Sequence, residues 1–561
     1  MPDALSTFST RATPQSQPAG RATTKNAAGG FVFSIDDVAR LRRFLVLGSE
    51  GGTYYTKAPD LTRQNAEVVV RMAENDPQTL VDTITEISVG GRAPRQNPAI
   101  FALAIAASLS GDEGRKYALS KVGAVCRTGT HLYLFAGYVQ QFRRWGRGLK
   151  RAIGNWYVER EVDKLAYQLL KYRQREGWMH RDLLRLAHPD IPDGSDREAL
   201  IRYLLIPAAS EPSAHALDKY GDKARSPWLG KAIDWEHVPE LVRIYHRVQT
   251  ATPRAAVGLI ENSDLSWEML PDELLTHPEV WEALVGRGMP QTALMRQLPR
   301  LTGLGLTTGD TGRRIASQLS DPELLKRGRV HPINVLVAQR TYASGHSAKG
   351  QGTWTPTPRI TDALDAAFYA AYGAVEPCDK RILLACDISG SMSYATSGLP
   401  ISCREAVAAL TLVSLNVEKD AEVIGFSDGG HGRGFAGWGT SMAAPLDISP
   451  RRRLDDVCSY MAALNFGRTD CALPMLWAMK TRQNFDAIWI LTDNETWFGN
   501  IHPWQALTQY REAYGPTQFG VVAMTATGQS IADPADPSQL DIAGFDTNVP
   551  QVISNFSAGR F

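Results

Sequence analysis

The sequence predicts a mainly α-helical first part followed by an α/β domain. From about residue 34 to residue 344, apolar residues recur at helical spacing and almost no segment alternates as a strand does. From about residue 380, short continuous apolar runs alternate with helical segments. The chain has 561 residues, too many for one hydrophobic core. We therefore expect an array of helices followed by a doubly wound parallel sheet.

The helical part is expected to consist of many short helices beginning just after residue 34. Ser34 is placed to cap the first helix, over residues 35–47, since Asp36 and Asp37 then lie in its first turn. Later helices open on proline, which suits the first turn because its missing N–H would have no partner there. These starts are Asn97-Pro98, Met289-Pro290, Asp321-Pro322 and His331-Pro332. No regular repeat is visible, but this succession of short helices resembles an α-solenoid of the HEAT type, whose curved inner surface suits a large ligand.

The second part carries the strands and helices of a parallel sheet. Buried strands are expected at residues 381–386, 422–426, 487–491 and 519–524, where the chain is short of polar residues. Helices are expected between and after them, at residues 404–417, 473–481 and 503–514. Residues 345–358 have the composition of a linker, so we expect the second domain over residues 359–561.

The first 30 residues are expected to form a disordered tail. They are rich in Ser, Thr, Pro, Ala and Gly, and they lack the apolar stretch of a signal peptide. No apolar run in the chain is long enough to span a bilayer. The six cysteines contain no C-x-x-C pair, so neither a zinc ribbon nor a disulfide framework is expected, and the thiols should be free and buried. We expect a cytoplasmic protein with no membrane partner.

A candidate cation site follows the first strand. Asp387, Ser389 and Ser391 form a D-x-S-x-S pattern whose carboxylate and hydroxyl oxygens can converge on a small divalent cation. This pattern resembles the metal-ion-dependent site of von Willebrand A domains. Thr469 and Asp493 stand where that family places its remaining ligands, which implies Mg²⁺, with Mn²⁺ or Ca²⁺ as alternatives. The simpler interpretation is a serine-rich turn in which Asp387 caps a helix.

A second motif points to a different chemistry. Residues 439–445, GTSMAAP, match the pattern around the nucleophilic Ser of subtilisin-like proteases, here Ser441. A triad also needs a base and an orienting carboxylate, which that family places far upstream. Here Asp428 and His431 lie almost beside Ser441, so a serine hydrolase remains a remote alternative.

A basic stripe lies inside this nearly neutral chain, whose net charge is +1. Between residues 121 and 185 the basic side chains outnumber the acidic ones, which indicates a local surface for a polyanion such as RNA. Arginine suits phosphate oxygens because its planar guanidinium can donate two hydrogen bonds at once. The alternative is a solvated helix face, where charge runs are common.

The helical part is similar to the TROVE module of the Ro ribonucleoprotein family. The resemblance rests on RLRRFL at residues 40–45, GSEGGTYY at residues 48–55, Arg92 with QNP at residues 96–98, and YRQREGWMHRDLLR at residues 172–185. The motifs WEMLP at residues 267–271, WEAL at residues 281–284 and VHPIN at residues 330–334 continue it in order. With the von Willebrand A domain, the resemblance to the Ro 60 kDa autoantigen family and its bacterial relatives spans residues 31–561, with the TROVE module over residues 31–358.

The resemblance implies a ring of HEAT-like helices joined to the von Willebrand A domain. It further implies that Y RNA binds a basic outer face and that the 3′ ends of misfolded non-coding RNAs enter the central hole. Carried onto this sequence, the Y RNA face would include Lys171, Arg173, Arg175, His180 and Arg181. Looser candidates for the basic surface or the hole are Arg42, Arg92, Arg95, Arg143 and Arg144.

The function that these observations favour is RNA binding in quality control, without enzymatic activity. A monomer that delivers RNA to an exoribonuclease is the expected setting. The main alternative is a cation-dependent scaffold that binds a protein partner through its carboxylate.

Overall fold

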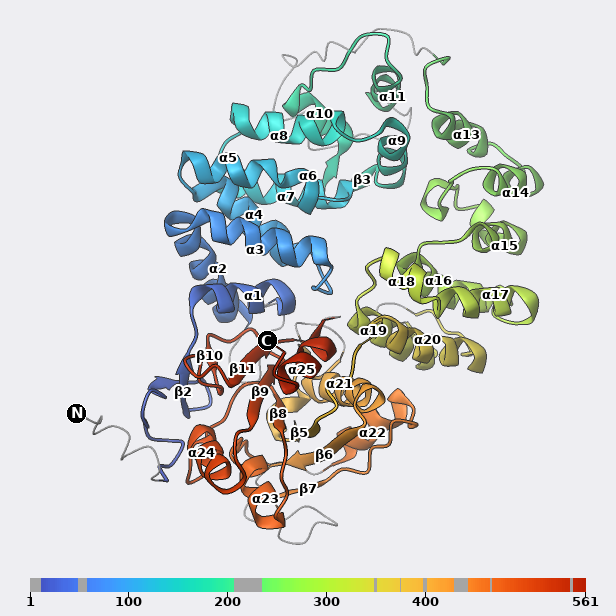
Figure 1. The fold of residues 1–561 in the computed structure, drawn as a ribbon. Coiled ribbons are helices and arrows are strands. Elements are labelled where there is room, and N and C mark those ends of the chain that lie inside the picture. The colour runs from blue at the N-terminus through green and yellow to red at the C-terminus, as the bar shows by residue number, and fades with distance from the viewer. Residues whose placement is uncertain are drawn as a thin grey trace.

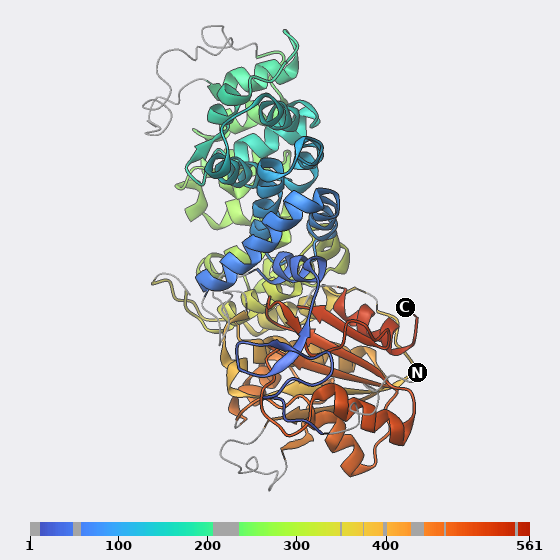
Figure 2. The ribbon, with the colours of Figure 1, turned by 90° about the vertical axis from the view of Figure 1, so that its left-hand side faces the viewer.

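The computed structural model describes residues 12–48, 58–205, 235–347, 351–373, 375–396, 401–427, 442–464, 467–544 and 548–560. The helices of the first part form two arms, and the C-terminal domain contacts both the first and the last helices of the array (Figure 1). Figure 2 shows the same two parts from the side, with the helices above the sheet. The predicted helical ring followed by an α/β domain is confirmed.

The first arm runs upward from the C-terminal domain in Figure 1. Its helices are α1 (Asp37–Leu47), α2 (Ala58–Asn75), α3 (Pro77–Gly90), α4 (Asn97–Leu109), α5 (Asp112–Ser120), α6 (Val122–Val125), α7 (Gly129–Phe142), α8 (Arg147–Val158), α9 (Val162–Lys171), α10 (His180–Ala187) and α11 (Asp196–Leu205). A hairpin of two short strands, β3 (Gln174–Arg175) and β4 (Trp178–Met179), lies between α9 and α10.

The second arm returns to the C-terminal domain. It comprises α13 (Glu240–Val248), α14 (Pro253–Glu261), η3 (Trp267–Met269), η4 (Leu274–Thr276), α15 (Pro278–Arg287), α16 (Gln291–Gly303), α17 (Gly309–Leu319), α18 (Pro322–Arg327), α19 (Pro332–Ala343) and α20 (Pro358–Ala370). The arms also touch near the C-terminal domain, where Asn334 Nδ2 donates to the carbonyl of Pro94 at 3.2 Å.

The helix starts follow the predicted chemistry with two corrections. Proline occupies the first turn of α4, α18 and α19, as expected, whereas Pro290 is the N-cap of α16 and precedes its first turn. Ser34 does not cap the first helix, because it ends a strand. The cap of α1 is Asp36, whose carboxylate accepts from the N–H of Ala39 at 2.7 Å. The carboxylate satisfies an N–H that the helix itself leaves unpaired.

The C-terminal domain is a doubly wound sheet in the order β11-β9-β8-β5-β6-β7, parallel except for β7. Its strands are β5 (Arg381–Asp387), β6 (Asp420–Phe426), β7 (Ala443–Pro445), β8 (Ala487–Thr492), β9 (Gln518–Ala523) and β11 (Gln539–Ala543). Its helices are η5 (Gly390–Ser393), α21 (Cys403–Val417), α22 (Leu454–Ala463), α23 (Leu473–Thr481), α24 (Pro503–Tyr514) and α25 (Val549–Ser557). Alternate residues of β5 belong to two hydrophobic cores, so helices cover both faces of the sheet.

The prediction of a disordered tail over residues 1–30 is wrong for residues 12–30. Residues 12–34, called the N-terminal strap below, lie along the C-terminal domain (Figure 2). The strap contains β1 (Thr24–Lys25) and β2 (Phe31–Ser34), and β2 pairs antiparallel with β10 (Gln529–Ser530). The strap is poor in apolar residues, but hydrogen bonds hold it to the C-terminal domain. Composition alone does not reveal such contacts.

The predicted domain boundary at residue 358 is too early. Helix α20 packs against α17, α18 and α19, so it continues the helical array. Ion pairs then join the array to the C-terminal domain at both ends. Arg43 of α1 pairs with Asp541 of β11, and Arg340 of α19 pairs with Glu405 of α21 at 2.7 Å. These contacts close the ring.

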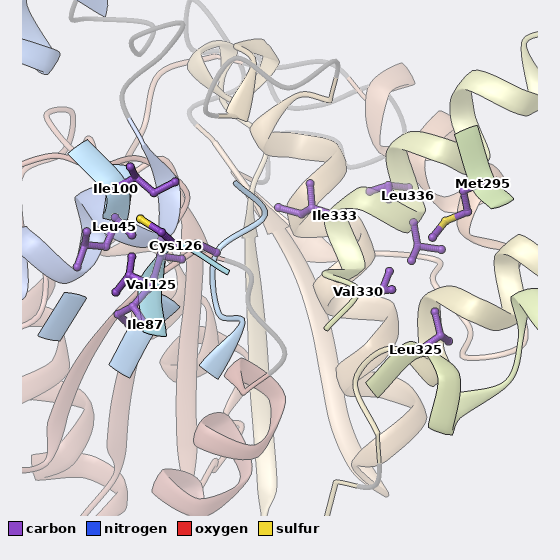
Figure 3. Close-up of a cluster of buried hydrophobic side chains, with 14 of the residues drawn as sticks. Leu45, Ile87, Ile100, Val125, Cys126, Met295, Leu325, Val330, Ile333 and Leu336 are labelled. Atoms are coloured by element: carbon purple, nitrogen blue, oxygen red, sulfur yellow. The ribbon is translucent and has the colours of Figure 1, made fainter. Parts of the chain in front are cut away.

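Each arm has a continuous apolar interior. Figure 3 shows Leu45, Ile87 and Ile100 packed beside Cys126 in the first arm, and Leu325 and Ile333 in the second. All six cysteines are free and buried, as predicted. Among the described helices, none combines the length and the apolar character needed to cross a membrane.

Candidate functional site

The predicted cation ligands lie at the carboxyl edge of the sheet. Asp387 ends β5, Ser389 is the N-cap of η5 and Ser391 lies within it, and Asp493 directly follows β8. Parallel strands β5 and β8 are neighbours, so their ends lie together. Thr469 belongs to a loop that is joined to the first one, since Gly390 N–H donates to the carbonyl of Gly467 at 3.0 Å.

Hydrogen bonds hold this group together. The N–H of Ser389 and the hydroxyl of Thr492 donate to the two oxygens of Asp387, at 2.9 and 2.7 Å. The hydroxyl oxygens of Ser389 and Ser391 are 3.1 Å apart. None of the five predicted ligands is more than 3% exposed.

Two carboxylates share this buried space. Burial raises the pKa of Asp387, and burial together with the charge of Asp387 raises the pKa of Asp493 to about 7. The guanidinium of Arg404 opposes the shift at Asp387 and donates to the carbonyl of Ser389 at 3.1 Å. A buried pair of carboxylates is unfavourable unless positive charge or protons compensate it.

The donor set fits a small hard cation. Two carboxylates and three hydroxyls are the oxygen ligands that Mg²⁺ and Mn²⁺ prefer. The hydroxyl of Thr469 is buried and has no hydrogen-bond partner among the described residues, as expected for an atom reserved for another ligand. In the described ranges no group of three or more His, Cys, Asp or Glu is suited to a metal, and the candidate site itself has two such residues, Asp387 and Asp493.

A basic cavity of about 1350 Å³ lies where the two arms approach each other. Arg95 comes from the first arm, whereas Arg296 and Arg300 come from α16 of the second. Among the described lining residues Asp272 is the single acidic one, and Trp354 adds an aromatic surface. This arrangement can attract a phosphate chain and offer a ring for a base.

Arg296 and Arg300 are functional candidates that the sequence reasoning missed. They are four residues apart on one helix, a spacing that places both side chains on the same face. Both are exposed. That spacing was visible in the sequence, but nothing in it showed that this face looks toward Arg95 across the ring.

The basic hairpin, residues 173–181, carries the exposed part of the predicted Y RNA face. Arg173 and Arg175 are exposed, and Arg181 is half-buried. Arg173 donates to the hydroxyl of Tyr245 in α13 and lies over its ring, which attaches the hairpin to the second arm. Arg144 is exposed on the loop between α7 and α8, and Trp145 of that loop contacts Trp178 of the hairpin at 6.4 Å between ring centroids.

Two residues predicted for this face are buried, so the prediction that they contact RNA directly is wrong for this structure. Lys171 is 8% exposed, with its ammonium 3.7 Å from Glu268. His180 is 2% exposed and its Nδ1 lies 2.9 Å from the hydroxyl of Tyr157. Both are buried together with apolar residues of their own helices.

The looser candidates have partners within the protein. Arg42 pairs with Glu86 through two hydrogen bonds of 2.9 and 2.8 Å, and Arg92 pairs with the same carboxylate at 3.1 Å. Arg143 donates to the carbonyl of Ala107 at 3.0 Å. Arg42 thereby links α1 to α3, and Arg143 links the end of α7 to α4.

The alternative hydrolase site lies outside the described residues, because Asp428, His431 and Ser441 all fall in the range 428–441. The motif at residues 48–55 also lies outside them, apart from Gly48.

Comparison with known proteins agrees with both halves of the structure. The TROVE domain family matches residues 24–341, and the Ro60 vWA domain family matches residues 381–557. The RNA-binding protein RO60 of Caenorhabditis elegans is 35% identical, over 96% of this chain and 90% of its own length. The chain belongs to the Ro60 family.

Further relatives of the Ro60 family support this. The RNA-binding protein RO60 of Deinococcus radiodurans is 34% identical, over 98% of this chain and 97% of its own length. The crystal structure of the Deinococcus radiodurans RO (RSR) protein matches 94% of this chain and 100% of that chain, with a TM-score of 0.65 and 34% identity.

Proposed function

We propose that this protein binds RNA and acts in RNA quality control. Its relatives are named RNA-binding protein RO60, and the helical ring carries exposed arginines, among them Arg175 and Arg296. The observation that carries the proposal is the cavity of about 1350 Å³ between the arms, whose lining includes Arg95, Arg296 and Arg300. Misfolded RNAs would present single-stranded 3′ ends to this cavity, and a Y RNA-like small RNA would bind the basic hairpin.

Crosslinking in cells tests the proposal. Ultraviolet crosslinking, purification of the tagged full-length protein and sequencing of the attached RNA should yield structured small RNAs and RNAs with unpaired 3′ ends. The double variant Arg296→Asp and Arg300→Asp should lose the RNAs with unpaired 3′ ends and keep the structured small RNAs. A crosslinked pool without RNA enrichment over a control protein would overturn the proposal.

The proposed setting is a non-enzymatic cytoplasmic monomer that passes RNA to an exoribonuclease. Six free, buried thiols suit a reducing compartment. The competing proposal, a cation-dependent scaffold that grips a partner's carboxylate, uses the sheet edge and not the arms. The scaffold proposal predicts a protein partner that dissociates when a chelator removes the cation.

The second part of the proposal is that the protein binds a divalent cation, most simply Mg²⁺, with Mn²⁺ or Ca²⁺ as alternatives. Asp387, Ser389, Ser391, Thr469 and Asp493 would hold it. The buried, unpartnered hydroxyl of Thr469 and the adjacent carboxylates support this assignment. A cation there would neutralise the two carboxylates and could take a carboxylate from a partner as a further ligand.

Asp387→Ala separates the two parts of the proposal. The variant should lose Mn²⁺ binding in isothermal titration calorimetry, because Asp387 supplies a charged ligand. RNA affinity of the full-length protein should change less than about twofold, because the basic residues lie on the helical ring. Loss of RNA binding in a variant that keeps its circular dichroism spectrum would show that the two sites are not separate.

A further inference from the structure

The N-terminal strap lies against the loops that carry two of the proposed cation ligands. Gln15 N–H donates to the carbonyl of Gly499 at 3.1 Å, and Phe31 N–H donates to the carbonyl of Gln15 at 2.9 Å. Strand β2 then extends the contact by pairing with β10. Residues from the first and last parts of the sequence therefore form one local structure.

Gln15 is fully buried and joins the two ligand loops. Its Nε2 donates to Asp470, which follows Thr469, at 2.7 Å, and to the carbonyl of Ile501 at 3.0 Å. Its Oε1 accepts from the hydroxyl of Thr496, in the loop that begins at Asp493. Every polar atom of the Gln15 side chain thus has a partner in the C-terminal domain.

The partners of Gln15 also contact each other. Thr496 Oγ1, which donates to Gln15, accepts from the N–H of Cys471 at 3.2 Å. Asp470 accepts a second hydrogen bond from the N–H of Ala472 at 3.0 Å. The two loops are therefore held at one spacing by a small network with Gln15 at its centre.

A second group of strap residues also contacts the Asp493 loop. Asn26 Nδ2 donates to the carbonyl of Thr496 at 2.7 Å, and Ala28 N–H donates to the carboxylate of Glu495 at 3.2 Å. A Cβ on Gly30 would lie 2.0 Å from the carbonyl oxygen of Thr496, so only glycine allows this approach.

We propose that the strap is a positioning element of the cation site, so that docking of the strap and binding of the cation strengthen each other. The inference rests on the cation site proposed above. Gln15 touches no ligand oxygen directly. It fixes the loops of Thr469 and Asp493, as outer partners orient ligands in metal sites. Because such coupling is reciprocal, the bound cation must also favour the docked strap.

The test uses the full-length protein and Mn²⁺ as the probe. Gln15→Leu should weaken Mn²⁺ binding by roughly 10–100-fold in isothermal titration calorimetry, the usual effect of losing an outer partner. Arg21→Ala is the matched control. Arg21 belongs to the same strap but pairs with Asp533, outside the ligand loops, so its removal should leave the affinity within about twofold of wild type.

Hydrogen exchange tests the reciprocal effect without a strap variant. Mn²⁺ should slow exchange of the amides in residues 12–34 of the wild type and should not do so in Asp387→Ala. The coupling would be overturned if Gln15→Leu and wild type bound Mn²⁺ with equal affinity, or if Mn²⁺ did not change hydrogen exchange in the strap. Either result would leave the proposed cation site unaffected. Absence of Mn²⁺ binding in the wild type would overturn both.

Discussion

His180 illustrates how a polar residue of a basic stretch becomes part of the core. Its ring lies 4.9 Å from that of Tyr133 and stacks on Trp156 at 6.1 Å between ring centroids. A Cβ on Gly129 would lie 2.9 Å from the ring, so the glycine makes room for it. Burial lowers the pKa of His180 to about 3. The ring is therefore neutral in the folded protein at physiological pH.

His180 should make the helical array sensitive to acid. An unfolded histidine titrates near 6.5 and the folded one near 3, so the unfolded chain binds more protons between these values. Stability is then fully present above pH 6.5 and is lost as the pH falls, by about 2 kcal/mol between pH 6.5 and pH 5. The melting temperature, measured by circular dichroism, should fall less between pH 6.5 and pH 5 in His180→Gln than in wild type.

The control for this prediction is His277→Gln, since His277 is half-exposed. The control should show the acid sensitivity of the wild type. Identical pH dependence in His180→Gln and wild type would contradict the role given to this ring.

At this scale, the sequence predicted which residues lie together at the sheet edge better than which residues of the basic stretch are exposed. The D-x-S-x-S motif is local, so the positions of Asp387, Ser389 and Ser391 follow from one loop. The burial of His180 depends on helix α10, where it shares an apolar face with Leu183, Leu184 and Ala187. That spacing was present in the sequence, but the surrounding arginines obscured it.

At the scale of the elements, the turn of the basic hairpin determines which arginines of residues 173–181 are exposed to solvent. Glu176 and Gly177 both have positive φ, of 54° and 75°, as a two-residue turn of type I′ requires. The turn reverses the chain between β3 and β4, so Arg175 faces outward while the flanking helices bury their own side chains. Glu-Gly is not the usual pair for this turn, and strands of two residues leave no periodic signal. The sequence therefore did not predict the hairpin.

Charge reversal on the hairpin should change the salt dependence of RNA binding. If Arg175 and Arg181 contact phosphates, Arg175→Glu combined with Arg181→Glu should reduce the slope of log affinity against log salt by about 1.5, since each lost contact removes roughly 0.7–0.9. Fluorescence anisotropy with one structured RNA over a salt series measures this slope.

The matched control is the double variant Lys480→Glu and Arg482→Glu, on exposed residues of the C-terminal domain. It changes the net charge equally and should leave the slope unchanged. A slope altered by the control as much as by the hairpin variant would point to long-range attraction and away from contacts at the hairpin.

On the scale of the whole molecule, the C-terminal domain acts as the closing segment of a ring. It holds α1 through Arg43 and α19 through Glu405, while the arms meet again at Pro94 and Asn334. The order of helices and the parallel sheet could be predicted from periodicity, because both depend on local patterns. Ring closure could not be predicted from periodicity and came only from the family resemblance, because it depends on ion pairs between residues far apart in the sequence, such as Arg43 and Asp541.

The closed ring should distinguish RNAs by their ends. An A-form duplex is about 20 Å wide, so a free single strand fits between the arms more easily than a duplex or a loop. A structured RNA with a free 3′ tail should bind more tightly than the same RNA with its tail paired or circularised. Competition at one fixed salt concentration measures the difference, because shared phosphate attraction would otherwise hide it.

Equal affinity for the circular and tailed RNAs would exclude threading through the ring. Binding at the basic hairpin would be unaffected by that result, and the protein would then be a carrier of Y RNA-like molecules alone.

The position of the strap also fixes the order of events during synthesis. The ribosome makes residues 12–34 long before it makes their binding surface, from Asp470 to Ser530. The helical arms, whose contacts are between neighbours in sequence, can fold as they leave the ribosome. Val32 of the strap therefore stays exposed while the residues between the strap and its binding surface are made, although Val32 is only 2% exposed in the folded protein. Docking of the strap is therefore a late event in maturation, after the last strands have been made.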